Sequence, residues 1–154
     1  MTDSQTDRIE KSVVLKAPVA RVWRALTDAG EFGEWFGVKL RGTFAAGTQL
    51  RGSVTHPGYE NVTFEITIDQ MEPERLLSWR WHPDAVDPAV DYSTEPMTTV
   101  VFRLEEIPDG TRLTVTETGF DQLWPWRVQQ AHQDNEGGWQ YQMESIRGYL
   151  DRTA

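Results

Sequence analysis

The chain has 154 residues and a formal net charge of -9, from 24 acidic and 15 basic side chains. This length is typical of one domain with one core, so we expect a single domain over residues 1–154. The negative charge would repel phosphate backbones, which excludes nucleic acid as an expected partner, and the absence of cysteine excludes disulfides, thiolate nucleophiles and cysteine-ligated metals.

The first segment, Met1 to Glu10, is polar and has no apolar stretch of the kind found in secretory signal peptides. No later segment approaches the roughly 20 apolar residues that span a bilayer. We therefore expect a cytoplasmic protein without membrane insertion.

A strand and a helix are predicted next. Apolar and polar residues alternate, imperfectly, from Ile9 to Lys16, which is the period of a strand. Pro18 suits the first turn of a helix, because its fixed φ fits there and its missing N–H would have had no partner. Apolar residues follow at helical spacing to Leu26, and Gly30 is expected to end this helix.

The middle of the chain alternates between apolar and polar residues in six further segments, which predicts strands over residues 38–44, 50–55, 62–69, 77–81, 100–104 and 113–115. Short turns, such as the one containing Pro108, Asp109 and Gly110, separate neighbouring segments. Such turns favour an antiparallel meander.

A long helix is predicted from about Pro125 to Asp151, where apolar residues recur three or four apart. At 1.5 Å per residue it would run roughly 40 Å, enough to cross a sheet. Gly137 and Gly138 interrupt its pattern, and we interpret them as a close approach of helix to sheet, with a kink or functional hinge as the alternative.

The longest irregular stretch lies between Trp81 and Met97 and is rich in proline and acidic residues. Loops of this length in compact domains are often lids over a binding site, and the alternative is a solvated hairpin loop. As a lid, its carboxylates would disfavour anionic ligands such as free fatty acids.

Five short motifs occur in order along the chain: Ala17-Pro18 with Val22-Trp23, Trp35-Phe36, the run Glu72 to Leu76 with Trp81, Gly110 to Leu113 with Gly119-Phe120, and Gly138-Trp139. Together they resemble the START-like, or SRPBCC, superfamily, in the branch similar to the C-terminal domain of the activator of heat-shock protein 90 ATPase. The resemblance implies an α+β helix-grip fold, in which a curved antiparallel sheet of about six or seven strands surrounds a long C-terminal helix. One or two short helices would follow the first strand, and a cavity would lie between the sheet and the last helix.

Two polar side chains are candidates for chemistry in such a cavity. Glu117 has the strand parity of Leu113 and Val115, so it is expected to point into an apolar face. Desolvation would raise its pKa and suit it to act as a general base or to hold a polar ligand group. The alternative is a solvated or ion-paired strand end. His56 has the strand parity of Val54, so it is also expected to reach the cavity. The alternative is that His56 is an ordinary turn residue before Pro57.

The chain contains seven tryptophans, a high number for this length. Aromatic side chains in a cavity wall suit flat or hydrophobic ligands. The alternative for each is ordinary core packing. The expected ligand-binding set is Trp35, Phe36, Val54, His56, Phe64, Trp79, Trp81, Phe102, Glu117, Trp139 and Met143. No metal site or cofactor is expected, because zinc-binding, nucleophile-elbow and phosphate-loop spacings are all missing.

Three function classes remain open. The first is non-enzymatic binding of a small hydrophobic molecule that is lipid-, sterol- or polyketide-like. The second is a cyclase- or hydrolase-like enzyme that uses Glu117 and His56. The third is a co-chaperone-like module related to the heat-shock protein 90 ATPase activator, with a chaperone contact and a role in the stress response. Trp124 and Trp126, which flank Pro125, are candidates for an apolar contact in a homodimer.

Overall fold

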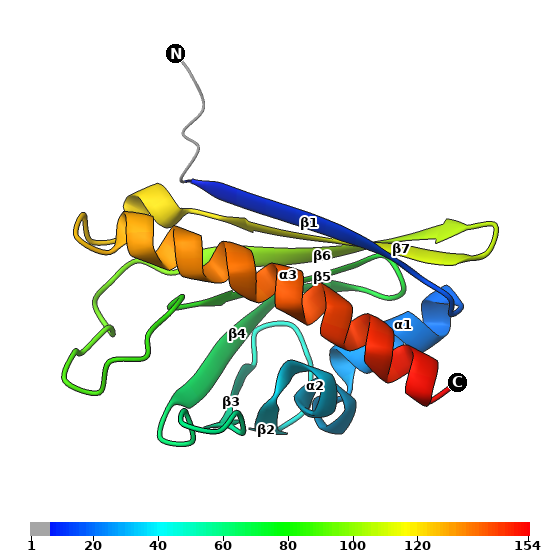
Figure 1. The fold of residues 1–154 in the computed structure, drawn as a ribbon, viewed down its shortest axis with the longest axis horizontal. Helices are drawn as coiled ribbons and strands as arrows, with labels where there is room; N and C mark the ends of the chain where they lie inside the picture. The colour runs from blue at the N-terminus through cyan, green and yellow to red at the C-terminus, as the bar shows by residue number, and fades with distance from the viewer. Residues whose placement is uncertain (1–6) are drawn as a thin grey trace, which may run out of the picture.

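The structure, a computed structural model, describes residues 7–154. Residues 1–6, part of the polar segment on which the expected cytoplasmic location rests, lie outside this range. Seven antiparallel strands form one sheet in the order β1-β7-β6-β5-β4-β3-β2, and helix α3 lies across one face (Figure 1). The strands are β1 (Arg8–Leu15), β2 (Val38–Arg41), β3 (Gln49–Val54), β4 (Thr63–Glu72), β5 (Leu76–Trp81), β6 (Thr98–Ile107) and β7 (Gly110–Thr118). The expected α+β helix-grip fold is confirmed.

Two short helices, α1 (Val19–Thr27) and α2 (Ala29–Phe36), follow β1 and lie near the C-terminal end of α3 (Figure 1). The prediction that the first helix ends at Gly30 is wrong. Helix α1 ends at Thr27, and Asp28 separates it from α2. The Asp28 carboxylate accepts the backbone N–H of Glu31 at 2.9 Å and thereby caps α2. Gly37 ends α2 with a φ of 93°, a left-handed conformation that favours glycine.

Helix α3 (Val128–Arg152) is continuous through Gly137 and Gly138. The interpretation of this pair as a close approach of helix to sheet is wrong, because a Cβ built on either residue meets no other atom within 4 Å. Both positions therefore face open space. A short 3-10 turn, η1 (Phe120–Gln122), precedes the helix.

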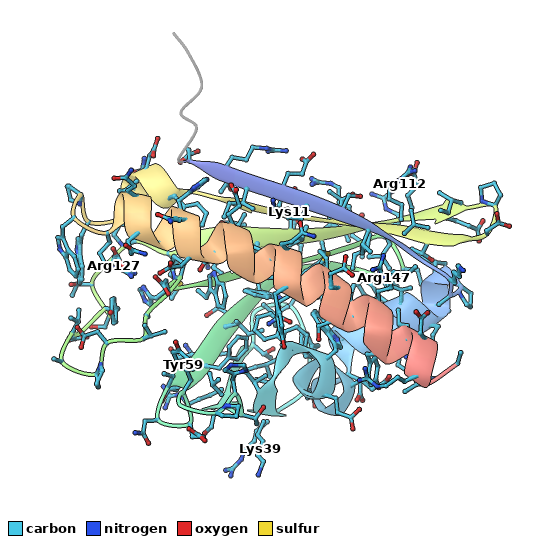
Figure 2. All side chains as sticks on the ribbon, viewed as in Figure 1. Lys11, Lys39, Tyr59, Arg112, Arg127 and Arg147 are labelled. Carbon is cyan, nitrogen blue, oxygen red and sulfur yellow. The ribbon has the colours of Figure 1, made fainter. Side chains whose placement is uncertain are left out.

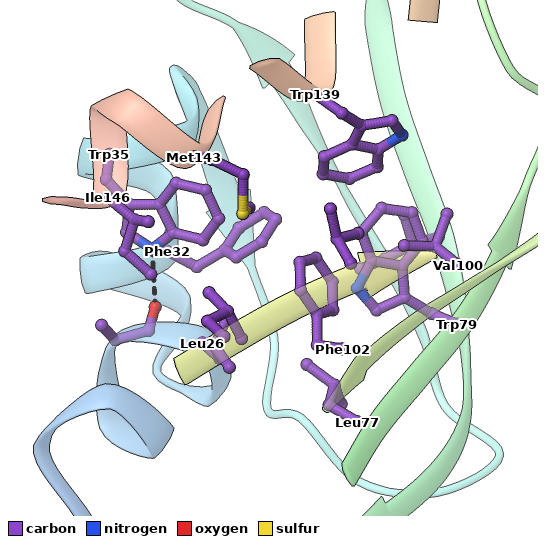
Figure 3. Close-up of a cluster of buried hydrophobic side chains, with 14 of the residues drawn as sticks. Leu26, Phe32, Trp35, Leu77, Trp79, Val100, Phe102, Trp139, Met143 and Ile146 are labelled. Atoms are coloured by element: carbon purple, nitrogen blue, oxygen red, sulfur yellow. Dashed lines mark hydrogen bonds between the residues drawn. The ribbon is translucent and has the colours of Figure 1, made fainter. Parts of the chain in front are cut away.

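The core lies between the sheet and the three α-helices, and Figure 3 shows its central part. Trp139 of α3 packs against Phe102 of β6 and Trp79 of β5, with ring centroids 5.7 and 6.2 Å away. The indole N–H of Trp35 donates to the backbone oxygen of Ala25 at 2.8 Å, which joins α2 to α1. Within residues 7–154, no helix is long and apolar enough to cross a membrane.

Candidate functional site

A cavity of about 710 Å³ lies between strands β3 to β5, helix α3 and the connection from β5 to β6. We call this connection, residues 82–97, the 82–97 loop. Aromatic side chains form much of the wall, among them Phe36, Phe64, Trp81 and Trp139. Tyr59 stands on the connection between β3 and β4, beneath α3 in the view of Figure 2. The volume is within the range of pockets that hold small molecules.

The structure separates ten of the eleven residues predicted for ligand binding into three groups. Those that line the cavity are Phe36, Val54, Phe64, Trp81 and Trp139. Four others, Trp35, Trp79, Phe102 and Met143, are buried in the core and are not part of the lining. His56 is exposed in the turn after β3, with its ring 5.9 Å from that of Tyr59, and also lies outside the lining.

Glu117 belongs to none of these groups, because it is fully buried behind two of the lining tryptophans. Its Oε2 accepts from Trp81 Nε1 at 2.7 Å and from Thr98 Oγ1 at 2.5 Å. Its Oε1 accepts from Trp139 Nε1 at 2.7 Å and from Asn135 Nδ2 at 3.0 Å. Each oxygen thus has two donors, which fills the hydrogen-bonding capacity of a carboxylate.

The environment of Glu117 sets both its pKa and its role. Burial raises the pKa of this carboxyl, and the four hydrogen bonds act in the opposite direction without cancelling the effect of burial. Because Trp81 and Trp139 both turn their N–H groups toward Glu117, their rings are held in the cavity wall. Glu117 is therefore a positioning residue for the aromatic wall in this structure.

The 82–97 loop is pinned to the start of α3 by a buried ion pair that sequence reasoning missed. Arg127 Nη2 lies 2.6 Å from Glu95 Oε1, and the side chains are 6% and 0% exposed. Arg127 also donates to the backbone oxygens of Pro83 and Asp84, at 2.8 and 3.0 Å. Glu95 and Arg127 are far apart in sequence, so no local pattern predicted the pair. Figure 2 labels Arg127 at the beginning of the helix.

A second contact joins the 82–97 loop to α3 through two acidic side chains. Asp84 lines the cavity and forms a hydrogen bond with Asp134 of α3. Burial raises the pKa of Asp84 to about 7, and the hydrogen bond and negative charge of Asp134 add to this effect, while Arg127 opposes it. Protonated Asp84 therefore donates to Asp134, and the negative charges of the two side chains repel each other once Asp84 has lost its proton.

We expect the substitution Asp84→Asn to change how stability depends on pH. The folded-state pKa of Asp84 is raised above its ordinary value of 3.8, so its stabilising contribution is complete below about pH 4 and is lost as the pH rises through about 7. An amide keeps a hydrogen bond to Asp134 at every pH, and asparagine tolerates the φ of 53° at this position. Urea unfolding should show the variant to be about 1 kcal/mol more stable than the wild type at pH 8 and equally stable at pH 4.

The substitution Asp87→Asn is the matched control for this prediction, because Asp87 is an exposed residue of the same loop. Its pH profile should follow that of the wild type. Parallel profiles for wild type and Asp84→Asn would show that the pKa of Asp84 is not raised in the folded protein.

Comparison with known proteins agrees with this architecture. A family model described as activator of Hsp90 ATPase homolog 1-like protein matches residues 16–151. The chain belongs to this family. The resemblance seen in the sequence motifs is thereby confirmed for the branch of the superfamily that they indicated. A search of curated protein sequences found no significant match.

Solved structures of the same fold extend the comparison. Protein MLL2253 from Mesorhizobium loti is 25% identical, with a TM-score of 0.76 over 96% of this chain and 98% of that one. DynU16, described as a putative protein in the dynemicin biosynthetic locus, is 26% identical with a TM-score of 0.72. The match covers 94% of this chain but 47% of DynU16, so the chain spans about half of that protein. Protein NE0264 from Nitrosomonas europaea, 19% identical with a TM-score of 0.76 over both full chains, shares the fold.

Proposed function

We propose that this protein binds a small hydrophobic molecule in the cavity between the sheet, α3 and the 82–97 loop. The observation that carries the proposal is the coexistence of a closely packed aromatic core with a neighbouring cavity of about 710 Å³ that aromatic side chains line but do not fill. Phe36 and Trp81 are half-buried and present ring surface to it, while Phe64 and Trp139 line it as nearly buried rings. Exposed ring surface binds flat apolar molecules by area and stacking.

Gly138 supports this proposal from the side of the helix. It lines the cavity, and a Cβ placed there meets nothing within 4 Å. Glycine inside a helix costs about 1 kcal/mol relative to alanine, and no close packing at Gly138 requires it. The missing side chain leaves space in the cavity, which is the space a ligand would take.

Catalysis by Glu117 and His56 has less support. The four donors around Glu117 occupy its acceptor positions, and Glu117 lies behind Trp81 and Trp139 and outside the lining. His56 is exposed outside the cavity. The arrangement therefore favours binding without obligatory chemistry. A co-chaperone-like role stays a prediction, to be tested by stimulation of the ATPase of heat-shock protein 90.

The test uses N-phenyl-1-naphthylamine, a neutral aromatic probe whose fluorescence increases in apolar surroundings. We expect the wild-type protein to bind it at one site, and the substitution Gly138→Leu to weaken binding at least about tenfold by filling the cavity. Gly137→Leu is the matched control, because it gives the same gain in helix propensity at a neighbouring glycine that is also exposed but lies outside the lining.

Both leucine variants should be at least as stable as the wild type, since each replaces a helical glycine that nothing contacts. A loss of binding in Gly138→Leu alone would support the cavity as the binding site. The proposal fails if the wild type does not bind the probe, or if both variants bind it as the wild type does.

A further inference from the structure

Two polar atoms in the cavity wall are buried without a hydrogen-bond partner. They are Oε1 of Gln142, on α3, and Nδ1 of His82, at the start of the 82–97 loop. A buried polar atom left without a partner costs about 1–3 kcal/mol, so native proteins rarely leave one unless a ligand or water satisfies it. Both residues line the same cavity, but neither atom presents surface to it, so a ligand donor would reach either atom only after a small shift of the side chain.

Four donors of the surrounding side chains are directed away from the cavity. The indole N–H groups of Trp81 and Trp139 and the amide of Asn135 donate to Glu117, and Nε2 of Gln142 donates to the backbone oxygen of Phe36 at 2.9 Å. Gln142 is thereby fixed with its amide nitrogen on α2 and its oxygen unpartnered. The buried part of the wall thus offers an acceptor in Gln142 while these four donors are already used.

The charge of the cavity lining also disfavours an anionic ligand. The lining contains the acidic residues Glu65, Asp84 and Asp87, and no lysine or arginine is found among the described residues that line it. Glu65 is paired with the exposed Arg51, which lies outside the lining. His82 supplies no compensating positive charge, because burial lowers the pKa of its imidazole below the ordinary value of 6.5. An anionic ligand would therefore be repelled and left unpaired.

We infer that the cavity selects a neutral ring compound that carries a hydroxyl or N–H donor, with Gln142 Oε1 as the acceptor that orients it. His82 Nδ1 is a second polar contact for the same ligand. The aromatic wall would hold the ring by area and stacking, and the donor would fix its orientation. This inference rests on the proposed function, since it names the chemistry of the ligand for the same cavity.

The experiment compares three pyrenes that share one ring system: 1-hydroxypyrene, 1-methoxypyrene and 1-pyrenecarboxylate. Dissociation constants are measured by titration at pH 7, where the phenol is protonated and the carboxylic acid is ionised. We expect 1-hydroxypyrene to bind about tenfold more tightly than 1-methoxypyrene, which keeps the oxygen but lacks the donor. The carboxylate should bind more weakly than either of the two neutral compounds.

The substitution Gln142→Met removes the acceptor at nearly constant volume, and it should reduce the preference for hydroxyl over methoxy to about twofold or less. Its binding of 1-methoxypyrene, which has no donor for Gln142, and its unfolding curve report separately on the loss of the contact to Phe36.

The possible outcomes distinguish this inference from the function on which it rests. Equal binding of all three pyrenes, or tightest binding of the carboxylate, overturns the inference and leaves hydrophobic binding intact. An unchanged hydroxyl preference in Gln142→Met overturns the assignment of the acceptor. If neither N-phenyl-1-naphthylamine nor any pyrene binds to the wild type, the proposed function itself fails.

Discussion

The substitution Glu117→Leu should lower the free energy of unfolding by at least about 3 kcal/mol, because it removes the acceptor for four buried or partly buried donors at once. Trp81 and Trp139 would each keep an indole N–H with no partner, at about 1–3 kcal/mol for a buried donor. Urea unfolding followed by circular dichroism measures the change. Because the same hydrogen bonds hold the cavity wall, the variant should also lose affinity for N-phenyl-1-naphthylamine.

Glu117→Gln separates the role of the acceptor from that of the charge. The amide oxygen can accept from Asn135 and Trp139, and the amide nitrogen can donate to Thr98, whose hydroxyl can turn to accept. The nitrogen cannot accept from Trp81, so one N–H loses its partner and the cost should be about 1–3 kcal/mol. A leucine variant as stable as the wild type would show that Glu117 does not hold the wall in place.

The second large effect is expected at the ion pair between Arg127 and Glu95. Arg127→Leu leaves a carboxylate that is 0% exposed without its cation, and it also removes the donors to Pro83 and Asp84. Breaking a buried pair by removing one partner typically costs about 3–5 kcal/mol. Urea unfolding should show a loss of this size, and the 82–97 loop should become sensitive to proteolysis because its attachment to α3 is gone.

Two further variants make this result specific. Arg147, on α3, pairs with Glu144 at the surface, so Arg147→Leu should change stability by no more than about 0.5 kcal/mol. The double substitution Arg127→Leu with Glu95→Leu should be more stable than Arg127→Leu alone, because no unpaired charge stays buried. If Arg127→Leu and Arg147→Leu have equal effects, the buried pair does not hold the loop.

The fold was predictable because its signals are local and periodic. Strand alternation and helical spacing placed the sheet and α3, and the parity of Glu117 with Leu113 and Val115 correctly indicated a buried side chain. The boundary near Gly30 was wrong because Asp28, a capping residue, ended the first helix and began the next. A glycine within a helical pattern does not show by itself whether the helix ends there or continues through it.

The site was less predictable, because its geometry depends on pairs that are distant in sequence. Parity placed Glu117 inside but could not show that four donors surround it, and those donors change its interpretation from a general base to a positioning residue. Gly138 carried a signal in the sequence that was interpreted as close packing, whereas the structure shows open space. The acceptor of Gln142 had no signal at all, since nothing in its neighbours indicates where its amide points.

The most direct test of a ligand-binding cavity is a crystal structure of the protein with 1-hydroxypyrene. We predict density for one ring system in the cavity against Trp81 and Trp139, beside Gly138. The hydroxyl should lie within hydrogen-bonding distance of Gln142 Oε1. A cavity found closed by its own side chains, with the compound bound elsewhere or not bound, would contradict the account.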